Sequence, residues 1–222
     1  CCEGRWITGT SDFMVGIGTT NPSSRLSVAG DACVSGVITA SNFAKADGSS
    51  LGGFSPDADE NLFAGTDAGG NLDGSSGCFN VLLGKDVGKA LTSGANNTIL
   101  GCGAGEVMTS GSCNIIIGKD AMGHCDTTGS NNIAIGCMAG RRVTGGNNNT
   151  FLGRYAGANL TSGCSNIIIG DAAAGTGAIT GIHNVFMAQC SGKNTTSGTR
   201  NIALGLCAMG GGTVTGNCNI VL

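Results

Sequence analysis

The sequence predicts an all-β chain that consists mainly of a repetitive, Gly-rich parallel β-solenoid. Three observations predict this class. Gly occupies 42 of 222 positions, or 19 %, against about 7 % in average proteins. Charged residues make up only 11 % of the chain, against roughly 25 % in average proteins. A unit of 17 or 18 residues that begins with Asn recurs along most of the chain.

The composition argues against several other classes. Collagen needs Gly at every third position and abundant Pro, whereas this chain contains 2 Pro. A hydrophobic fraction of 41 % with a net charge of −3 is unlike a disordered chain. Long apolar runs and basic stripes are both missing from the sequence, so we expect no membrane insertion and no nucleic-acid partner.

Residues 1–55 lie outside the repeat and predict a β-rich neck followed by a linker. Residues 15–31 have the pattern of a strand, a Pro-containing turn and a second strand, and residues 33–40 continue with alternating small and β-branched side chains. We therefore expect two domains, a neck or connector with its linker at 1–55 and a repeat shaft at 56–222. The chain starts without Met and ends within a repeat, which predicts a piece of a longer polypeptide.

Each repeat unit follows the approximate consensus N-[IVT]-[IFA]-[IL]-G-x-x-A-G-x-x-x-T-S-G-x-x, with a degenerate copy at Asn61. This pattern predicts a strand of four or five residues, a Gly turn, a second short segment and a T-S-G turn. So short a unit cannot bury its own apolar face, so the units must stack as rungs about 4.8 Å apart. The predicted structural positions are Asn80, Asn97, Asn114, Asn132, Asn149, Asn166, Asn184 and Asn201, and Gly84, Gly101, Gly118, Gly136, Gly153, Gly170 and Gly205.

The Asn that starts each rung has two interpretations. At a turn, Asn tolerates a left-handed backbone and bonds neighbouring amides, and stacked Asn side chains can form an amide ladder. The alternative is glycosylation, since N-x-[ST] triplets begin at Asn96, Asn148, Asn159 and Asn194. A repeat rich in Asn and Thr produces such triplets by chance, so we favour the ladder.

The predicted strands are apolar on both faces. The first and third residues after each Asn share one face, and the second residue points to the other. All three are apolar in most rungs, as in Ile115-Ile116-Ile117. One small coil has a single interior, so the second apolar face needs a partner. Another copy of the same chain is the natural partner, which predicts a homo-oligomer about the fibre axis.

The chain contains 12 Cys and no C-x-x-C motif. Cys190 and Cys207 lie at the same offset in neighbouring rungs, within the Cα range that a disulfide allows, and are therefore the candidate disulfide. We expect most of the other cysteines to be small buried hydrophobic side chains, with further disulfides as the alternative. A metal site at His124-Cys125 is a remote third interpretation.

Other candidate chemistry is sparse. The acidic segment 57–61 is similar to the start of a calcium loop, but its twelfth position is Ala68 instead of Glu, which favours a solvated linker. Arg141-Arg142 and Arg154-Tyr155 fall at variable outward positions, where a glycan could bind, although solvated decoration is the favoured interpretation. We find no P-loop and no catalytic triad, and we predict no catalytic, cofactor or metal site and no enzymatic activity.

Residues 15–30, V-G-I-G-T-T-N-P-S-S-R-L-S-V-A-G, closely resemble a segment common in bacteriophage tail-fibre proteins. The repeat units resemble the shaft repeats of fibres from phages of marine cyanobacteria, and they are similar to the head repeats of trimeric autotransporter adhesins. The resemblance implies a homotrimeric fibre shaft in the virion, a rigid spacer that also attaches to a host-cell surface. Its expected partners are itself, other fibre or baseplate proteins, and a host glycan or protein.

Two alternatives remain at this stage. A bacterial trimeric surface adhesin would place the chain at the cell surface, but the adhesin units are shorter and the sequence shows neither a membrane anchor nor a coiled-coil stalk. A glycan-degrading phage depolymerase would need paired carboxylates. Asp120, Asp126 and Asp171 are too scattered to suggest such a pair.

Overall fold

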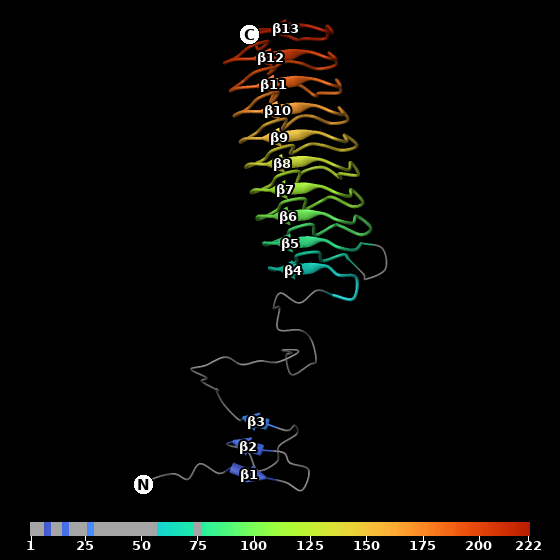
Figure 1. Cartoon of the computed structure of the whole chain (residues 1–222), viewed down its shortest axis with the longest axis vertical. Coiled ribbons are helices and arrows are strands. Elements are labelled where there is room, and N and C mark those ends of the chain that lie inside the picture. The colour runs from blue at the N-terminus through green and yellow to red at the C-terminus, as the bar shows by residue number, and fades with distance from the viewer. Residues whose placement is uncertain (1–6, 10–14, 18–25, 29–56, 73–76) are drawn as a thin grey trace, which may run out of the picture. The chain divides into compact units, whose positions relative to one another are not determined.

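The computed structural model describes residues 7–9, 15–17, 26–28, 57–72 and 77–222 (Figure 1). The chain divides into two compact units, Cys1–Gly48 and Ser49–Leu222. The domain boundary predicted between residues 55 and 56 lies outside the described residues, as does the β pattern predicted at 33–40.

The first unit contains a three-stranded sheet of β1 (Ile7–Gly9), β2 (Val15–Ile17) and β3 (Leu26–Val28). Strands β2 and β3 are the two strands predicted on either side of the Pro-containing turn, and they pair in parallel. Strand β1 pairs with β2 in antiparallel orientation and was not predicted from the sequence.

The second unit is a ten-stranded parallel sheet in which each strand comes from one rung. The strands are β4 (Leu62–Ala64), β5 (Val81–Leu83), β6 (Thr98–Leu100), β7 (Ile115–Ile117), β8 (Ile133–Ile135), β9 (Thr150–Leu152), β10 (Ile167–Ile169), β11 (Val185–Met187), β12 (Ile202–Leu204) and β13 (Ile220–Val221). Their order in the sheet is their order in the sequence, and every adjacent pair is parallel. The described residues contain no helix. The prediction of an all-β parallel solenoid with rungs of 17 or 18 residues is confirmed.

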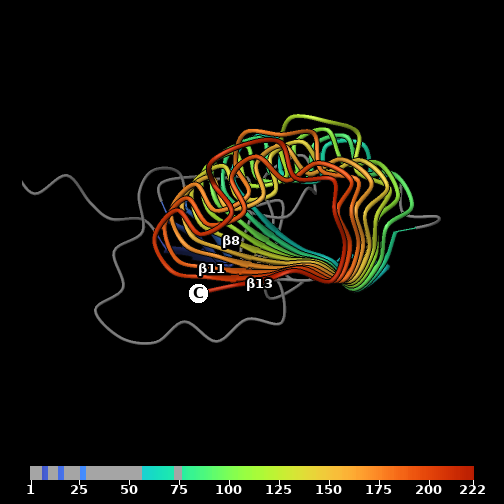
Figure 2. The ribbon, with the colours of Figure 1, turned by 90° about the horizontal axis from the view of Figure 1, so that it is seen from above.

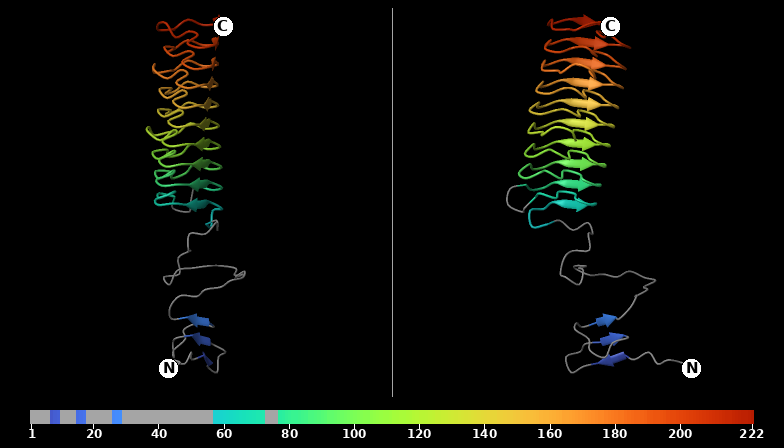
Figure 3. Two further views of the ribbon diagram at one scale, coloured as in Figure 1. Left: turned by 90° about the vertical axis from the view of Figure 1, so that its left-hand side faces the viewer. Right: turned by 180° about the vertical axis from the view of Figure 1, so that it is seen from behind.

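The strands pair so that residues at the same position of the repeat unit lie next to each other. Equivalent residues pair across neighbouring strands, as in Ile115 with Ile133 and Ile117 with Ile135. Seen from above, the coils of the solenoid lie over one another, with the strands gathered along one flat side (Figure 2). The views of Figure 3 show this side as a single column of strands, β4 to β13. One extended surface therefore repeats the same three strand positions at every rung.

The interior of the coil is built from the second residue of each strand from β5 to β12. These side chains are fully buried: Leu82, Ile99, Ile116, Ala134, Phe151, Ile168, Phe186 and Ala203. They contact a second interior column seven residues after the Asn, which is Ala in most rungs, and a third column eleven residues after it, as in Leu91 and Leu160. The first and third strand residues point away from the coil and stay half-buried or exposed. The single chain therefore buries one face of the strand, and the burial of both faces stays a prediction.

Left-handed residues make the corners of each coil. Positive φ recurs at four positions of the unit: just before the Asn, and four, six and eight residues after it. Four residues after the Asn, each Gly from Gly65 to Gly205 has a φ between 122° and 137°. A Cβ built on Gly118 would lie 2.6 Å from the carbonyl oxygen of Gly136 in the next rung. The turn residue, which is Gly after every strand from β4 to β12 except β11, therefore ends these strands after three residues, which is shorter than the four or five predicted.

Candidate functional site

An uninterrupted ladder of asparagine side chains runs through the solenoid from Asn61 to Asn219. In each rung the Oδ1 accepts two hydrogen bonds from the Asn of the following rung, one from its backbone N–H at 2.9–3.0 Å and one from its Nδ2 at 2.8–3.2 Å. From Asn61 to Asn201, the Nδ2 also donates its second hydrogen to the carbonyl oxygen of the turn Gly that closes the same rung, at 2.8–3.1 Å. From Asn61 to Asn201 these residues are at most 1 % exposed. The predicted amide ladder is confirmed.

The backbone role predicted for these asparagines is wrong in one detail. None of the ladder asparagines, all of which lie in the described residues, has a positive φ. The left-handed residue is the one before each of them, with φ between 54° and 61°, and its identity varies from Asn148 to His183 and Arg200. The ladder Asn is buried with its side chain in the hydrogen-bonded ladder, whereas the residue before it makes the left-handed corner.

The acidic segment before the first rung is largely exposed to solvent, as expected, and it also caps the ladder. Asp57 occupies the place that an Asn of a preceding rung would take. Its Oδ1 accepts the backbone N–H of Asn61 at 2.8 Å, and its Oδ2 accepts the Asn61 Nδ2 at 3.1 Å. The backbone N–H of Asp57 donates to the Asn61 carbonyl oxygen at 2.9 Å, and the N–H of Asp59 donates to the Asp57 Oδ1. The carboxylate thus supplies the acceptors that the first rung would otherwise lack.

The outward face of the sheet is apolar along its whole length. Fourteen of the sixteen outward residues in β5–β12 are Val, Leu, Ile or Met, and the other two are Thr98 and Thr150. Five of the apolar ones are at least 37 % exposed: Ile115, Ile135, Ile167, Met187 and Leu204. We call these first and third strand residues of β4–β13 the outward sheet face. Contiguous apolar surfaces of this kind mark interaction sites.

The cysteines do not behave as buried hydrophobic side chains, and that prediction is wrong for the nine that the structure describes. Four are exposed, Cys102, Cys113, Cys207 and Cys218, and the others are half-buried: Cys78, Cys125, Cys137, Cys164 and Cys190. Most of them occupy corner positions next to the Asn or after the Gly turn, outside the three interior columns. All nine thiols are free. Cys190 and Cys207 lie in equivalent corners of adjacent rungs, with φ of 56° and 55°, and their disulfide stays a prediction.

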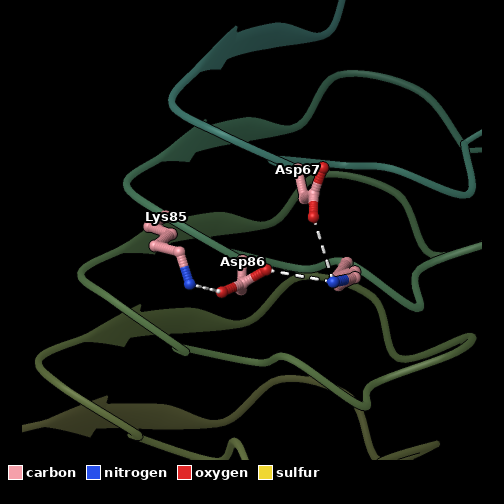
Figure 4. A network of polar contacts seen from close by, with 4 residues as sticks. Asp67, Lys85 and Asp86 are labelled. Atoms are coloured by element: carbon pink, nitrogen blue, oxygen red, sulfur yellow. Dashed lines mark hydrogen bonds and ion pairs between the residues drawn. The ribbon is translucent and has the colours of Figure 1, made fainter.

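Charged side chains pair at the corners that follow β4 and β5. Lys85 Nζ lies 2.6 Å from Asp86 Oδ2, and Lys89 Nζ bridges Asp86 Oδ1 at 3.1 Å and Asp67 Oδ2 at 3.0 Å (Figure 4). Hydrogen bonds from Lys85 and then Lys89 hold the pKa of the Asp86 carboxyl below its usual range. The same contacts raise the pKa of both lysines, through Asp86 for Lys85 and chiefly through Asp67 for Lys89. This network ties the first rung to the second.

A second corner pair lies in the middle of the solenoid. Arg154 Nε lies 2.9 Å from Asp171 Oδ1, and Arg154 Nη2 donates to Asp171 Oδ2 at 2.9 Å. The hydrogen bond to Asp171 raises the pKa of Arg154, and its guanidinium lies 5.3 Å from the centroid of the Tyr155 ring. The Arg154-Tyr155 pair, considered from the sequence as a glycan contact, is thus engaged in rung-to-rung contacts.

The remaining polar candidates also make contacts between rungs. Arg141 Nη2 lies 3.2 Å from the Nε2 of His124, and Asp126 Oδ1 accepts the Thr109 hydroxyl at 2.7 Å. Of the triplet asparagines, Asn159 and Asn194 donate their Nδ2 to glycine carbonyls, while Asn96 and Asn148 are exposed. In the part of the chain that the structure describes, no group of three His, Cys, Asp or Glu side chains is arranged to hold a metal. The described residues include no helix long and apolar enough to cross a bilayer.

The chain matches no protein-family model, no curated protein and no solved structure.

Proposed function

We propose that this chain is the shaft of a phage tail fibre, a non-enzymatic rigid spacer that assembles as a homotrimer. The observation that carries this proposal is the outward sheet face, which runs uninterrupted along the same solenoid that the asparagine ladder holds together. The resemblance of residues 15–30 and of the repeat units to phage fibres supports it. The virion is then the proposed location.

Rigidity along the fibre follows from the rung-to-rung contacts. Every junction between rungs combines strand pairing with buried bonds of the asparagine ladder, and corner hydrogen bonds add to both. Buried hydrogen bonds of amide groups are costly to leave unmade, so a bend that opens one rung is resisted at several points. With a spacing of about 4.8 Å, ten rungs span roughly 45 Å.

The trimer would cover the outward sheet face. Three copies placed around an axis parallel to the stack would bring three of these faces together and remove them from water. A second copy matches the face because it has the same rung period. No charged residue lies on the outward sheet face of β4–β13, so bringing copies together would bury no unpaired charge.

The oligomeric state tests this proposal directly. Light scattering with size separation should give three times 21.7 kDa, about 65 kDa, for the full chain. A monomer of 21.7 kDa at micromolar concentration would contradict the trimer. Small-angle scattering then separates a side-by-side trimer, in which the shaft length is unchanged, from an end-to-end one, in which it is multiplied.

Attachment to a host surface is the second part of the proposal. The residue just before each ladder asparagine varies from rung to rung and is exposed in most rungs, as in Asn148, His183 and Arg200, which suits these positions to contact a glycan or a protein. Incubation of the full chain with purified host-surface glycans should give binding without turnover. Release of reducing ends would contradict the non-enzymatic assignment and favour the depolymerase alternative.

A further inference from the structure

The outward sheet face contains two polar side chains, and both lie in the same column. The first residues of β4–β13 are Leu, Val or Ile in every strand except β6 and β9, where they are Thr98 and Thr150. The column of third residues contains only Ala, Leu, Ile and Met. Thr98 and Thr150 are half-buried at outward positions, three strands apart. Their hydroxyls are therefore the only features of this face, among the described residues, that distinguish one rung from another by polarity.

Assembly of this face with further copies raises a problem of register. The same columns repeat at every rung, so two copies displaced by one rung still place apolar side chains against apolar side chains. Apolar contact is non-directional and does not by itself select one displacement. The face also lacks charged pairs that could select it, because no residue of its two columns in β4–β13 is charged.

We propose that Thr98 and Thr150 set the register of the chains in the assembled shaft. This inference rests on the homotrimer proposed above. In a closed symmetric trimer, equivalent residues lie at the same height around the axis. The three Thr98 hydroxyls then meet in one layer and the three Thr150 hydroxyls in another. A hydroxyl both donates and accepts, so three of them can bond one another in a ring.

A displaced assembly loses these rings. After a shift of one rung, Thr98 would face Val81 or Ile115 of the neighbouring copy, and its hydroxyl would be buried against an aliphatic side chain. Burying a hydroxyl without a partner is unfavourable. A shift of three rungs brings Thr98 against Thr150 but leaves the other Thr of each chain unmatched. One polar residue at an apolar interface fixes register in coiled coils by the same physics, at a cost in stability.

Photo-cross-linking in the full chain tests the proposal. A benzophenone side chain at Leu100, which lies in the same rung as Thr98, reports which rung of the neighbouring copy is opposite. With both threonines present, we expect cross-links confined to β5, β6 and β7. In the Thr98→Val/Thr150→Val variant, we expect trimers of equal or higher thermal stability whose cross-links spread over many rungs. The control is Thr180→Val, an exposed Thr outside the face, which should leave the pattern unchanged.

A second variant moves the two hydroxyls by one rung. Thr98→Val/Ile115→Thr/Thr150→Val/Ile167→Thr should restore confined cross-links within its own trimers. When it is refolded together with the wild type, cross-links between the two kinds of chain should be displaced by one rung, because that displacement brings both pairs of hydroxyls to the same height. Confined cross-links in the double Val variant, or undisplaced cross-links in the mixed trimers, would overturn the register proposal and leave the trimer standing. A wild-type chain that is monomeric by light scattering would overturn both.

Discussion

From Asn61 to Asn201, each ladder asparagine engages both hydrogens of its side-chain amide inside the coil, and its Oδ1 accepts two further bonds. The Nδ2 of Asn132 donates to Asn114 Oδ1 and to the Gly146 carbonyl oxygen, while its Oδ1 accepts two bonds from Asn149. This arrangement explains why the residue is Asn at every rung. Asp has no donor for the Gly carbonyl, Ser lacks the second polar atom, and Gln is too long for the spacing.

Replacing Asn132 by Ala should destabilise the solenoid severely. The change leaves the donors of Asn149 and the carbonyl of Gly146 buried without partners, at about 1–3 kcal/mol for each group. We expect a loss of several kcal/mol in the free energy of unfolding, measured by urea denaturation. The matched control is Asn131→Gly, at an exposed left-handed residue with φ of 60°, where Gly fits and stability should change little. Equal effects of the two substitutions would contradict the role of the ladder.

One rung departs from the repeat at its turn. Ala188 has φ of 110° where the other rungs have Gly between 122° and 137°. Ala188→Gly should therefore stabilise the chain by about 1 kcal/mol, because relief of the backbone strain exceeds the entropy that Gly adds to the unfolded state. The reverse change, Gly153→Ala, would place a Cβ 2.8 Å from the Gly170 carbonyl oxygen and should destabilise. Thermal melts of both variants check the sign.

At the scale of the element, the first rung depends on its cap. Replacing Asp57 by Ala removes the acceptors for the N–H and Nδ2 of Asn61, which the ladder supplies elsewhere. We expect fraying of residues 57–72, seen as faster amide hydrogen exchange there and unchanged exchange in residues 130–160. Asp57→Asn is the conservative comparison, since it retains one carbonyl acceptor and should fray less. Uniform acceleration along the whole solenoid would instead indicate a global loss of stability.

The network of Lys85, Asp86 and Lys89 should make the stability of the first two rungs depend on pH. Because the pKa of Asp86 is lowered from 3.8 on folding, its ion pairs stabilise the chain above that value, and the contribution is lost as the pH falls through the folded pKa. Asp86→Asn should therefore lower the melting temperature at pH 7, and this effect should shrink as the pH falls through the folded pKa. Added salt should reduce the difference at pH 7, since the lysines are largely exposed. A difference that does not shrink on acidification would point to lost packing instead.

Periodicity predicted the rungs, the strand positions, the turn glycines and the asparagine ladder, because these features recur at fixed spacings in the sequence. It did not decide which apolar face is inside. In the structure the interior column ranges in size from Ala134 to Phe151, since the neighbouring interior columns can compensate. Gly157 leaves the space that Phe151 fills, since a Cβ at position 157 would clash with the Phe151 ring. The outward columns are more uniform, as expected for a repeating surface.

Two features had no periodic pattern and were missed. Asp57 occurs once, and its role depends on the ladder that follows it, so the acidic segment resembled an ordinary linker. The cysteines were predicted to be buried from their general chemistry, whereas the offsets of most of them lie outside the three interior columns, where the side chains are exposed or half-buried. Once the interior columns are known, the position of a cysteine relative to the ladder Asn indicates whether its side chain is buried or lies at the surface.

At the scale of the whole solenoid, the outward sheet face is the feature that a single chain leaves unsatisfied. Folding of one chain buries the second residue of each strand from β5 to β12 completely, so the coil itself does not need the first and third residues to be apolar. A charged residue on this face should therefore leave the coil folded and prevent assembly. The face is the only part of the solenoid where this separation between folding and assembly is expected.

Ile135→Glu, at a side chain 38 % exposed in the single chain, tests that separation. In the proposed trimer three carboxylates would meet near the axis, where like charges repel and burial disfavours ionisation. We expect a chain with the β-type circular dichroism of the wild type but a mass near 21.7 kDa by light scattering at pH 7. Thr180→Glu, which adds the same charge at an exposed residue away from the face, should remain trimeric. If Ile135→Glu assembles as the wild type does, the contact lies elsewhere on the solenoid, because an apolar interface cannot accept three carboxylates without loss.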